Sequence, residues 1–335
     1  MIDIITQKKE WKNTLIELES YDFYHTFDYH NLSKKENEKP LLLVYSQGDL
    51  RIAIPFLKRE ISGTPYFDFT SVYGYAGPIY KNVPEDYDNT TFHSQLIDYL
   101  NTNKIISVFS RLNPYLGLQP LILKNLGETP ISGKVVNIDL TKSIEEQRTQ
   151  YGKSTKNRTN KCRRIATVKE VTSREDLETY IDIYYENMDR LSALDSYYFS
   201  KEYFFDFLEC EDFKTRVLLV IENETGKAMA GAMFVESKSI VQFHLSGTRT
   251  EFLNWAPANL FLDEMRLLAT EEGYKIFNLG GGLGGQEDSL FNFKASFSKD
   301  HRDFRLWRYI VDQKVYETLS KGNEGSYFPL YRKIK

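Results

Sequence analysis

Five glycines within the six positions 280–285 constrain this chain more than any other stretch of its sequence. They follow Ile276–Leu279, a short apolar segment typical of a strand. Glycine loses more backbone entropy on folding than any other residue. A chain therefore concentrates glycines where its backbone must turn sharply or approach another molecule closely. The sequence thus predicts a strand that ends in a functional loop.

A short helix is predicted directly after this loop. Asp288 or Ser289 can cap it by accepting hydrogen bonds from its first free amides. Leu290, Phe293 and Phe297 are spaced by three and four residues, which predicts one apolar face. Lys294 is predicted to rise among these apolar neighbours. The ordinary alternative is a lysine whose stem covers apolar surface while its ammonium reaches water.

Gly280, Gly282 and Gly285 also fit the pattern G-x-G-x-x-G, which is typical of dinucleotide sites. Such a site needs a βαβ unit and an acidic residue about 20 positions further on, at the next strand. Only about 50 residues follow the loop, and they predict one helix, one strand and a tail. The dinucleotide interpretation therefore lacks its structural context.

The run FNLGGGLGGQEDSLFNFKASFS at 277–298 resembles the C-terminal signature of FemAB/FemX-like transferases, which belong to the GNAT acyltransferase superfamily. The segments 66–80 (YFDFTSVYGYAGPIY) and 243–261 (FHLSGTRTEFLNWAPANLF) resemble the same family, so the resemblance spans nearly the whole chain. It implies two tandem GNAT-like lobes. It also implies that the family's Phe-Lys pair falls on Phe293 and Lys294, and that this lysine takes part in transfer.

GNAT-like chemistry is the attack of an amine on an activated acyl group. A cation or backbone amides near the developing oxyanion can stabilise it. We therefore predict that Lys294 is catalytic, with amides around Gly281 and Gly282 assisting. Asp288 and Phe293 are predicted to line the substrate site.

His244 lies in a predicted strand just before Ser246 and Gly247, near where GNAT folds place substrate, and is a candidate general base. A structural histidine is the equally open alternative. The segment 249–257 contains no glycine, and so departs from the Q/R-x-x-G-x-G/A loop that holds acyl-CoA in common GNAT enzymes. This departure fits the FemX-like group, whose donor is aminoacyl-tRNA and whose acceptor is a lysine side chain of a peptidoglycan precursor. Other relatives use acyl-CoA.

The chain contains two similar successions of helix, hairpin, strand, helix and strand, a weak internal duplication. A turn at Gln47–Asp49 predicts a hairpin in the first half, and runs at 217–221, 229–235 and 240–245 predict a meander in the second. We therefore predict an α/β class with α+β-like mixed sheets. The expected lobes are residues 1–140 and 141–335, placed around a shared cleft.

A basic segment at 151–169 begins the second lobe and contains no acidic residue. Unbalanced positive charge in an acidic protein favours a bound anion over a solvated helix face, and phosphate is the natural candidate. Lys156, Arg158 and Lys161 are therefore predicted to bind a phosphate-bearing substrate. In the first lobe, Tyr73 and Tyr75 lie in a loop of small residues and are predicted to contact substrate.

The composition of the chain restricts which classes of protein it can belong to. A net charge of −4 and a pI near 5.9 argue against wholesale nucleic-acid binding, although a local basic patch keeps tRNA as a candidate partner. Two distant cysteines predict no disulfide scaffold, and five scattered histidines predict no metal site. The sequence shows no signal peptide and no apolar run long enough to span a membrane. We expect a cytoplasmic protein that touches a membrane only through a membrane-linked substrate.

The sequence thus predicts an acyltransferase that moves an acyl or aminoacyl group onto an amine of a phosphate-bearing cell-envelope precursor. Aminoacyl-tRNA or acyl-CoA would be its co-substrate, with no tightly bound cofactor. One alternative is an acyl-CoA-dependent N-acyltransferase acting on an amino sugar or another small amine. A further alternative is a GNAT-like scaffold without catalytic activity. The loop and Lys294 argue against a scaffold, which has no need of either.

Overall fold

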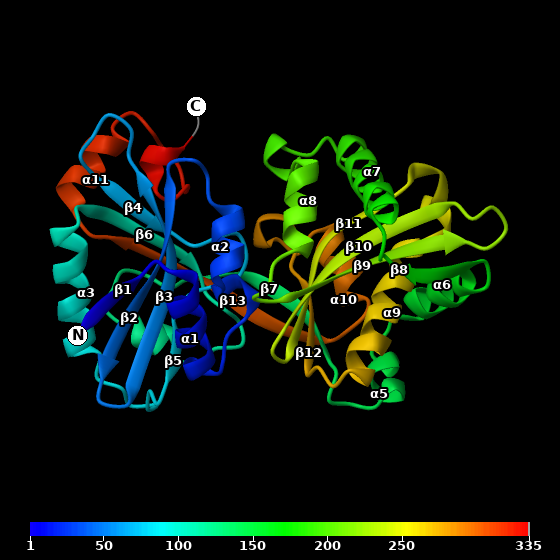
Figure 1. The fold of residues 1–335 in the computed structure, drawn as a ribbon, viewed down its shortest axis with the longest axis horizontal. Coiled ribbons are helices and arrows are strands. Elements are labelled where there is room, and N and C mark those ends of the chain that lie inside the picture. The colour runs from blue at the N-terminus through cyan, green and yellow to red at the C-terminus, as the bar shows by residue number, and fades with distance from the viewer. Residues whose placement is uncertain (334–335) are drawn as a thin grey trace. The chain divides into compact units, whose positions relative to one another are not determined.

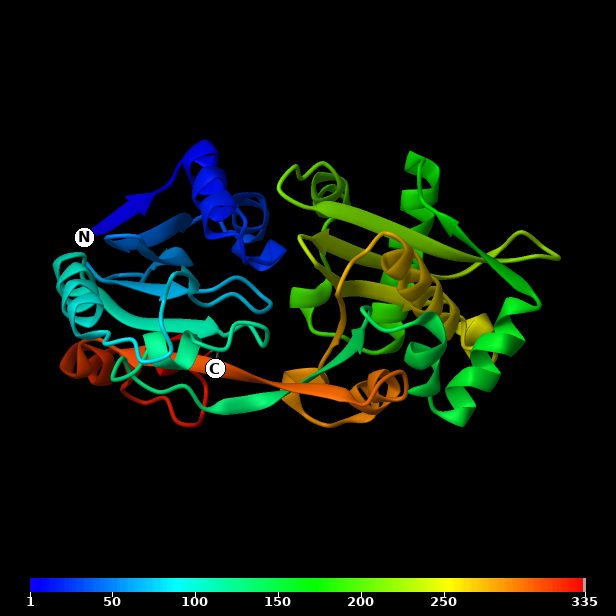
Figure 2. The ribbon, with the colours of Figure 1, turned by 90° about the horizontal axis from the view of Figure 1, so that it is seen from below.

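The computed structural model describes residues 1–333, and the chain divides into two compact units (Figure 1). Unit 1 contains Met1–Ser132 and the segment from Asp303 onward, and unit 2 contains Gly133–Arg302. The chain leaves unit 1 through β7 (Ile131–Asp139) and returns through β13 (Asp300–Ile310), coloured green and orange in Figure 2. The predicted boundaries were therefore wrong at the C-terminal end, because the segment after residue 302 belongs with the first unit.

The strands of unit 1 form a mixed sheet in the order β1-β2-β3-β4-β6-β13. The parallel pair is β4–β6, and the other neighbours are antiparallel. The predicted hairpin about Gly48 is confirmed as β2–β3. The strand bounds are β1 Ile2–Ile5, β2 Glu38–Gln47, β3 Leu50–Glu60, β4 Phe67–Thr70, β5 Ile79–Lys81 (paired with β3) and β6 Ile105–Arg111.

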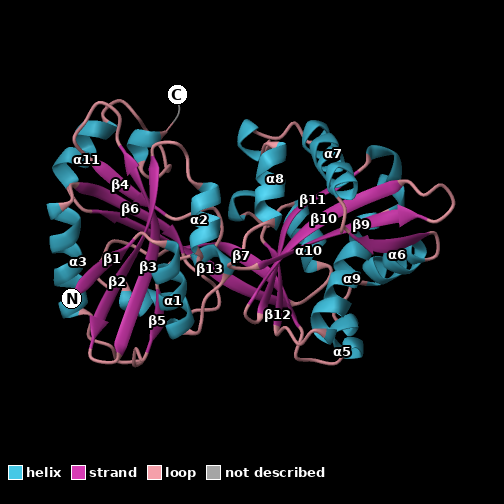
Figure 3. Cartoon of the chain, viewed as in Figure 1, coloured by secondary structure: helices cyan, strands magenta, loops and turns pink. Residues whose placement is uncertain are grey.

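Helices flank this sheet (Figure 3), and aliphatic and aromatic side chains fill the core beneath them. Trp307 of β13 is fully buried near Phe56, and its indole N–H donates to the carbonyl of Leu126 at 2.6 Å. A buried indole needs such a partner, so this bond fixes β13 in the core of unit 1. The helix bounds are α1 Lys8–Leu18, α2 Phe27–Ser33, α3 Thr90–Thr102, α4 Gln119–Ile122 and α11 Gln313–Ser320.

The strands of unit 2 follow the order β7-β12-β11-β10-β9-β8. The antiparallel meander predicted from the sequence is confirmed as β9, β10 and β11. The strand β12 pairs parallel with β11 and antiparallel with β7. The bounds are β8 Ala166–Glu170, β9 Lys214–Glu222, β10 Ala228–Ser237, β11 Ile240–Thr248 and β12 Ile276–Gly280.

Two groups of helices cover opposite faces of the sheet in unit 2. On one face, α7 packs on β10 and β11, and Tyr180 of α7 meets Gly231 of β10. On the other face, Phe261 of α9 contacts Phe234 of β10 and Phe243 of β11. The bounds are α5 Ile144–Thr149, α6 Lys153–Arg163, α7 Arg174–Arg190, α8 Lys201–Leu208, α9 Pro257–Glu271 and α10 Ser289–Ala295.

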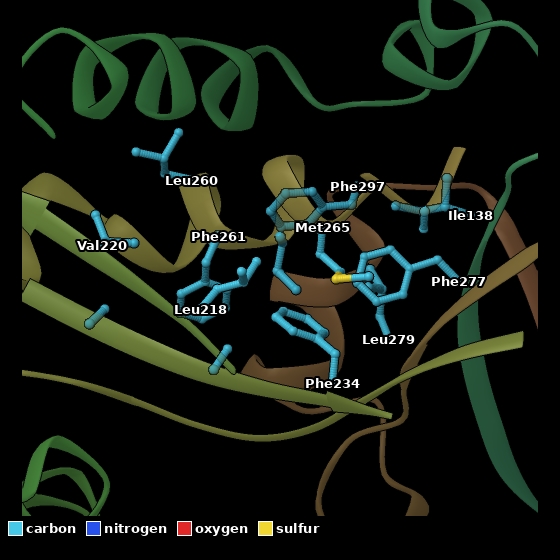
Figure 4. Packing of buried hydrophobic residues seen from close by; sticks show 14 of the residues in the cluster. Ile138, Leu218, Val220, Phe234, Leu260, Phe261, Met265, Phe277, Leu279 and Phe297 are labelled. Carbon is cyan, nitrogen blue, oxygen red and sulfur yellow. The ribbon is translucent and has the colours of Figure 1, made fainter. Parts of the chain in front are cut away.

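The core of unit 2 lies between α9 and the sheet. Figure 4 shows Phe261 and Met265 of α9 pointing toward Leu218, Phe234 and Phe277 of three strands. Burying each such side chain contributes about 1.5–3 kcal/mol, so this face anchors α9 and the end of β12 firmly. Within residues 1–333, no helix combines the length and the apolar character needed to cross a membrane.

Candidate active site

The parallel strands β11 and β12 part after three residue pairs. They pair at Ile240–Ile276, Val241–Phe277 and Gln242–Asn278, and β11 then continues to Thr248 paired with β10. A β-bulge in β11 makes His244 the extra residue, because its neighbours Phe243 and Leu245 pair with consecutive residues of β10. The two strands therefore open away from each other where β12 delivers the glycine loop.

Close packing explains the glycines of this loop. A Cβ on Gly281 would lie 2.5 Å from the carbonyl oxygen of Lys134. A Cβ on Gly282 would lie 2.0 Å from the carbonyl oxygen of Gln286 and 2.4 Å from a carboxylate oxygen of Asp288. Gly280 has a φ of +77°, a conformation that other residues rarely adopt. The loop therefore cannot accept side chains at these positions without moving.

Asp288 joins the loop to α10, as the predicted cap requires. Its two carboxylate oxygens accept from the amides of Phe291 at 2.9 Å and Leu283 at 3.0 Å. These backbone hydrogen bonds hold the pKa of Asp288 below its ordinary value, because they stabilise the ionised form. The role predicted for Asp288 as a helix cap is confirmed, while contact with substrate stays a prediction.

Lys294 is buried at the centre of this arrangement, with 8% of its surface exposed. Its ammonium donates to the carbonyl of Gly281 at 2.7 Å and lies 5.8 Å from the centroid of the Phe243 ring. Burial lowers the pKa of Lys294 from 10.5 to about 8, and the more distant negative charge of Asp288 opposes this shift. The ammonium therefore points inward rather than reaching for water.

The apolar face predicted for α10 was wrong at Leu290, which is 43% exposed. The buried face consists instead of Phe291 and Lys294, three residues apart. Phe293 is partly buried, with its ring centroid 5.5 Å from that of Phe297, which lies beyond the end of the helix at Ala295. Because α10 has only seven residues, its buried face is limited to two positions, and Lys294 occupies one of them.

The loop amides are less available than the sequence suggested. The amide of Leu283 donates to Asp288, and the amide of Gly285 donates to the carbonyl of Gly282. The amides of Gly281 and Gly282 stay predicted donors, and Asn278 offers a further one. The side chain of Asn278 is fully buried and accepts from the amide of Gly280, but its Nδ2 has no hydrogen-bond partner among residues 1–333. An unmade bond of this kind costs about 1–3 kcal/mol, and such groups in native proteins often belong to functional sites.

Sequence reasoning missed Asn278 and Phe243 as members of this site. Both lie where β11 and β12 part, a feature set by strand pairing between distant segments. One signal in the sequence was available for Asn278, a polar residue inside an otherwise apolar strand. Phe243 gives no such signal, because an aromatic residue in a strand is ordinary.

His244 does not share a face of the sheet with Lys294. Its ring stacks on Phe207 of α8 at 5.0 Å between centroids, whereas Phe243 and Lys294 lie on the face covered by α9. Burial lowers the pKa of His244 to about 4, so the imidazole is neutral at physiological pH. The structure does not bring this residue together with Lys294, and its role as a base stays a prediction.

The basic segment forms α6, the turns around it and most of β8, and part of its charge is compensated. Lys169 of β8 pairs with Asp176 at 2.8 Å. Arg163 pairs with Asp263 at 2.8 Å and Glu264 at 3.2 Å, both on α9. The sequence indicated an uncompensated segment, and this was wrong at Arg163 because α9 lies far away in the sequence. Lys161 lies 4.4 Å from the ring of Trp255.

Lys156 and Arg158 make no ion pair among the described residues, and Arg158 is exposed. Asp263 also pairs with Arg148 and the buried Arg266, and this buried network fixes α5 and α6 on α9. The remaining cations of α6 are thus presented on a firmly held helix.

The two tyrosines predicted to contact substrate lie in unit 1. Tyr73 is exposed, and the guanidinium carbon of Arg111 lies 5.3 Å from the centroid of its ring. Tyr75 is partly buried against Tyr24 and Phe304. Tyr73 is therefore open to a ligand, while Tyr75 mainly packs the loop.

We compared the sequence and the structure of this chain with those of known proteins. No protein-family model matches the chain, and no curated protein matches its sequence. The crystal structure of FemX matches with a TM-score of 0.72 at 13% identity, over 94% of this chain and 99% of that one. The chain has the FemX fold. The predicted α/β class with tandem GNAT-like lobes is thereby confirmed.

Two further solved structures share this fold. The first is the C-terminal domain of a putative lysylphosphatidylglycerol synthetase from Agrobacterium fabrum. It has a TM-score of 0.58 and 13% identity, over 92% of this chain and 94% of that one. The second is a tandem GNAT protein from the clavulanic acid biosynthesis pathway, with a TM-score of 0.51 and 8% identity. It covers 92% of this chain and 98% of its own length.

Proposed function

We propose that this protein is an acyltransferase in which Lys294 stabilises the transition state of acyl or aminoacyl transfer to an amine. One observation carries the proposal. A buried ammonium with no ion pair in residues 1–333 lies at the point where β11 and β12 part, held by the carbonyl of Gly281. A buried charge of this kind is costly, and active sites are where such costs are commonly found.

The proposed reaction begins when the acceptor amine attacks the carbonyl carbon of the donor. The carbonyl oxygen gains negative charge, and Lys294 donates a hydrogen bond to it as Asn278 Nδ2 supplies a second. The new C–N bond forms, the bond to the donor's oxygen or sulfur breaks, and the proton given up by the amine ends on that leaving oxygen or sulfur. Low polarity around Phe243 strengthens the attraction between ammonium and oxyanion because little water screens it.

The proposed acceptor is a phosphate-bearing cell-envelope precursor, and the proposed donor is aminoacyl-tRNA. The support for a polyanion is the set of exposed cations on α6, together with Trp255 beside Lys161, since aromatic rings and cations recur in sites for single-stranded nucleic acid. The likeness to FemX agrees with this choice.

Acyl-CoA is the alternative donor, and an amino sugar or another small amine would be its acceptor. The observation that favours it is the likeness to a tandem GNAT protein. Against it, a 3₁₀ segment (η3, Thr250–Trp255) occupies the backbone directly before α9, where common GNAT enzymes carry their glycine-rich loop. A membrane-linked precursor remains compatible with either donor.

Native mass spectrometry of the full chain distinguishes these donors. The protein is incubated with aminoacyl-tRNA, acetyl-CoA and nucleotide-linked amino-sugar precursors, separately and in pairs. We expect a complex with aminoacyl-tRNA and a product that is heavier than the precursor by one aminoacyl group. An acetylated product without tRNA binding would support acyl-CoA. No transfer with any pair would reject the acyltransferase proposal.

A further inference from the structure

Arg111 ends β6 in unit 1 and carries an unbalanced positive charge. Its guanidinium carbon lies 5.3 Å from the centroid of the Tyr73 ring and 5.6 Å from that of Phe109. No carboxylate pairs with it among residues 1–333. Two other arginines of the unit do pair, since Arg59 and Arg332 each bind Asp68 at 2.6 Å. Arg111 is therefore set apart by aromatic rather than acidic neighbours.

The loop that carries Tyr73 is held by side chains from three other segments. The hydroxyl of Tyr29 donates to the carbonyl of Tyr73 at 2.9 Å, and Asn113 Nδ2 donates to the carbonyl of Tyr75 at 3.0 Å. Gln119 Nε2 donates to two further carbonyls of the loop, at 3.1 and 2.8 Å. A loop with four of its carbonyls bound in this way is pre-organised, which lowers the entropy cost of binding a ligand.

Gly74 fixes the loop against the body of the unit. Its φ is +120°, and a Cβ would lie 2.0 Å from the ring of Tyr24. This close contact presses the backbone onto Tyr24 while the neighbouring Tyr73 faces outward, 64% exposed. An exposed aromatic ring on a rigid loop is a typical feature of a recognition surface.

The groups beneath this loop do not neutralise Arg111. Burial raises the pKa of the Tyr24 and Tyr29 phenols, so both remain uncharged. Burial also lowers the pKa of His25 to about 4 and that of His30 to about 3, so neither imidazole is charged near neutral pH. The carboxylate of Asp22 accepts from the amide of Phe23 at 2.7 Å.

The guanidinium of Arg111 makes no hydrogen bond and no ion pair among residues 1–333, and the side chain is partly exposed, so its N–H groups are available. Aromatic rings contact a guanidinium through its flat face, whereas its N–H groups point outward within its plane. This planar fork matches two oxygens of a carboxylate or phosphate group. A ligand that bears such an oxyanion beside a flat or apolar group would contact Arg111 and Tyr73 together.

We infer that Arg111 and Tyr73 form an oxyanion-binding subsite in unit 1, in which Arg111 holds a carboxylate or phosphate by two hydrogen bonds and Tyr73 covers the adjoining part of the ligand. The assignment of this subsite to the acceptor substrate rests on the proposed function. Its ability to bind an oxyanion does not.

Calorimetric titration of the full chain with phenyl phosphate and with benzoate tests this subsite, with benzyl alcohol as the uncharged probe. We expect at least one anion to bind and benzyl alcohol not to bind. Arg111→Gln should weaken the bound anion at least tenfold, and Arg111→Lys should weaken it less, since it keeps the charge but loses the fork. Tighter binding of phenyl phosphate assigns the ligand group as phosphate, and tighter binding of benzoate assigns it as carboxylate.

Two controls separate this inference from its alternatives. Arg51 also makes no ion pair among residues 1–333, and it bonds to the carbonyls of Gly48 and Leu50, so Arg51→Gln should leave binding unchanged. Lys294→Met should retain anion binding even if all transfer is lost, which keeps the subsite distinct from the proposed chemistry. Absence of binding by both anions, or binding to Arg111→Gln within twofold of wild type, would overturn the subsite.

Discussion

Lys294 in unit 2 and Arg111 in unit 1 are both cations without an ion pair among the described residues, but their surroundings differ. Lys294 is buried, hydrogen-bonded to a backbone carbonyl, and has its pKa lowered to about 8. Arg111 is partly exposed and lies beside the rings of Tyr73 and Phe109. A lysine's charge responds to burial, whereas a guanidinium stays charged and offers a fixed fork. The difference suggests that Lys294 acts on a reacting bond and Arg111 holds a substrate.

The largest effect that this comparison predicts is that of Lys294→Met on transfer. Methionine keeps most of the side-chain volume and removes the charge, so donor and acceptor should still bind. Transfer should fall by about 10²- to 10³-fold, the usual loss for one group that stabilises an oxyanion. Single-turnover rates at saturating substrates measure this effect. Lys299→Met, at an exposed lysine just beyond α10, is the matched control.

A rate for Lys294→Met within threefold of wild type would show that burial of this lysine serves packing alone. The contrast between the two cations would then have no catalytic meaning, and the mechanism proposed for Lys294 would be wrong.

The cations on the surface of α6 have a third kind of environment. They do not lie beside two aromatic rings as Arg111 does. Simultaneous charge reversal of Lys156, Arg158 and Lys161 should weaken binding of tRNA or a phosphate-bearing precursor by about 30-fold, because each exposed contact contributes up to about 1 kcal/mol. Wild-type binding should also weaken steeply with added salt. Filter binding at several salt concentrations measures both effects.

The matched control reverses three exposed lysines of unit 1, at positions 34, 35 and 39, which changes net charge equally. Equal loss of binding in both triple variants would indicate a general charge effect. Affinity that does not depend on salt would count against α6 as a phosphate-binding surface.

A pH titration sharpens the comparison further. Lys294 is protonated below its pKa of about 8 and loses its charge as pH rises through that value. If the ammonium is the active form, the single-turnover rate should fall about tenfold for each pH unit well above 8. The Arg111 subsite should bind its anion equally at pH 7 and pH 9, because guanidinium keeps its charge. A rate that rises from pH 7 to 9 would assign the neutral amine as the active form.

The smallest effect is expected from His244→Gln. His244 stacks on Phe207, on the face of the sheet away from Lys294, so turnover should stay within threefold of wild type. A general base at this position would act in its neutral form, and activity would decline only as pH falls through its pKa of about 4. A drop of 10²-fold, together with the loss of such an acidic decline, would reinstate His244 as the base.

Local patterns predicted much of this molecule from sequence. The cap at Asp288, the hairpin about Gly48 and the inward Lys294 all follow from spacing over a few residues. The predictions that were wrong depend on contacts between segments far apart in the sequence. Pairing of Leu306 with Arg111 returns the C-terminal segment to unit 1, and neither residue indicates the other in the sequence.

The same reason explains what was missed at the site. Asn278 becomes a buried unpaired donor only because β11 parts from β12 beside it. Arg163 has no acidic neighbour in its own segment of the sequence, but it forms ion pairs with Asp263 and Glu264 of α9. The position of α9 depends on the packing of the whole core. The spacing of residues within one helix or strand cannot predict such contacts between distant segments.

The discontinuous composition of unit 1 has a consequence for biosynthesis. A ribosome releases residues 1–132 long before β13, so β6 emerges without the strand that pairs with it, and the core waits for Trp307. Unit 2 is contiguous and can fold while unit 1 is still incomplete. During translation, the exposed edge of β6 is a site for mispairing with other nascent chains. Unit 1 therefore depends on the segment from Asp303 onward, which is made after unit 2, for its completion.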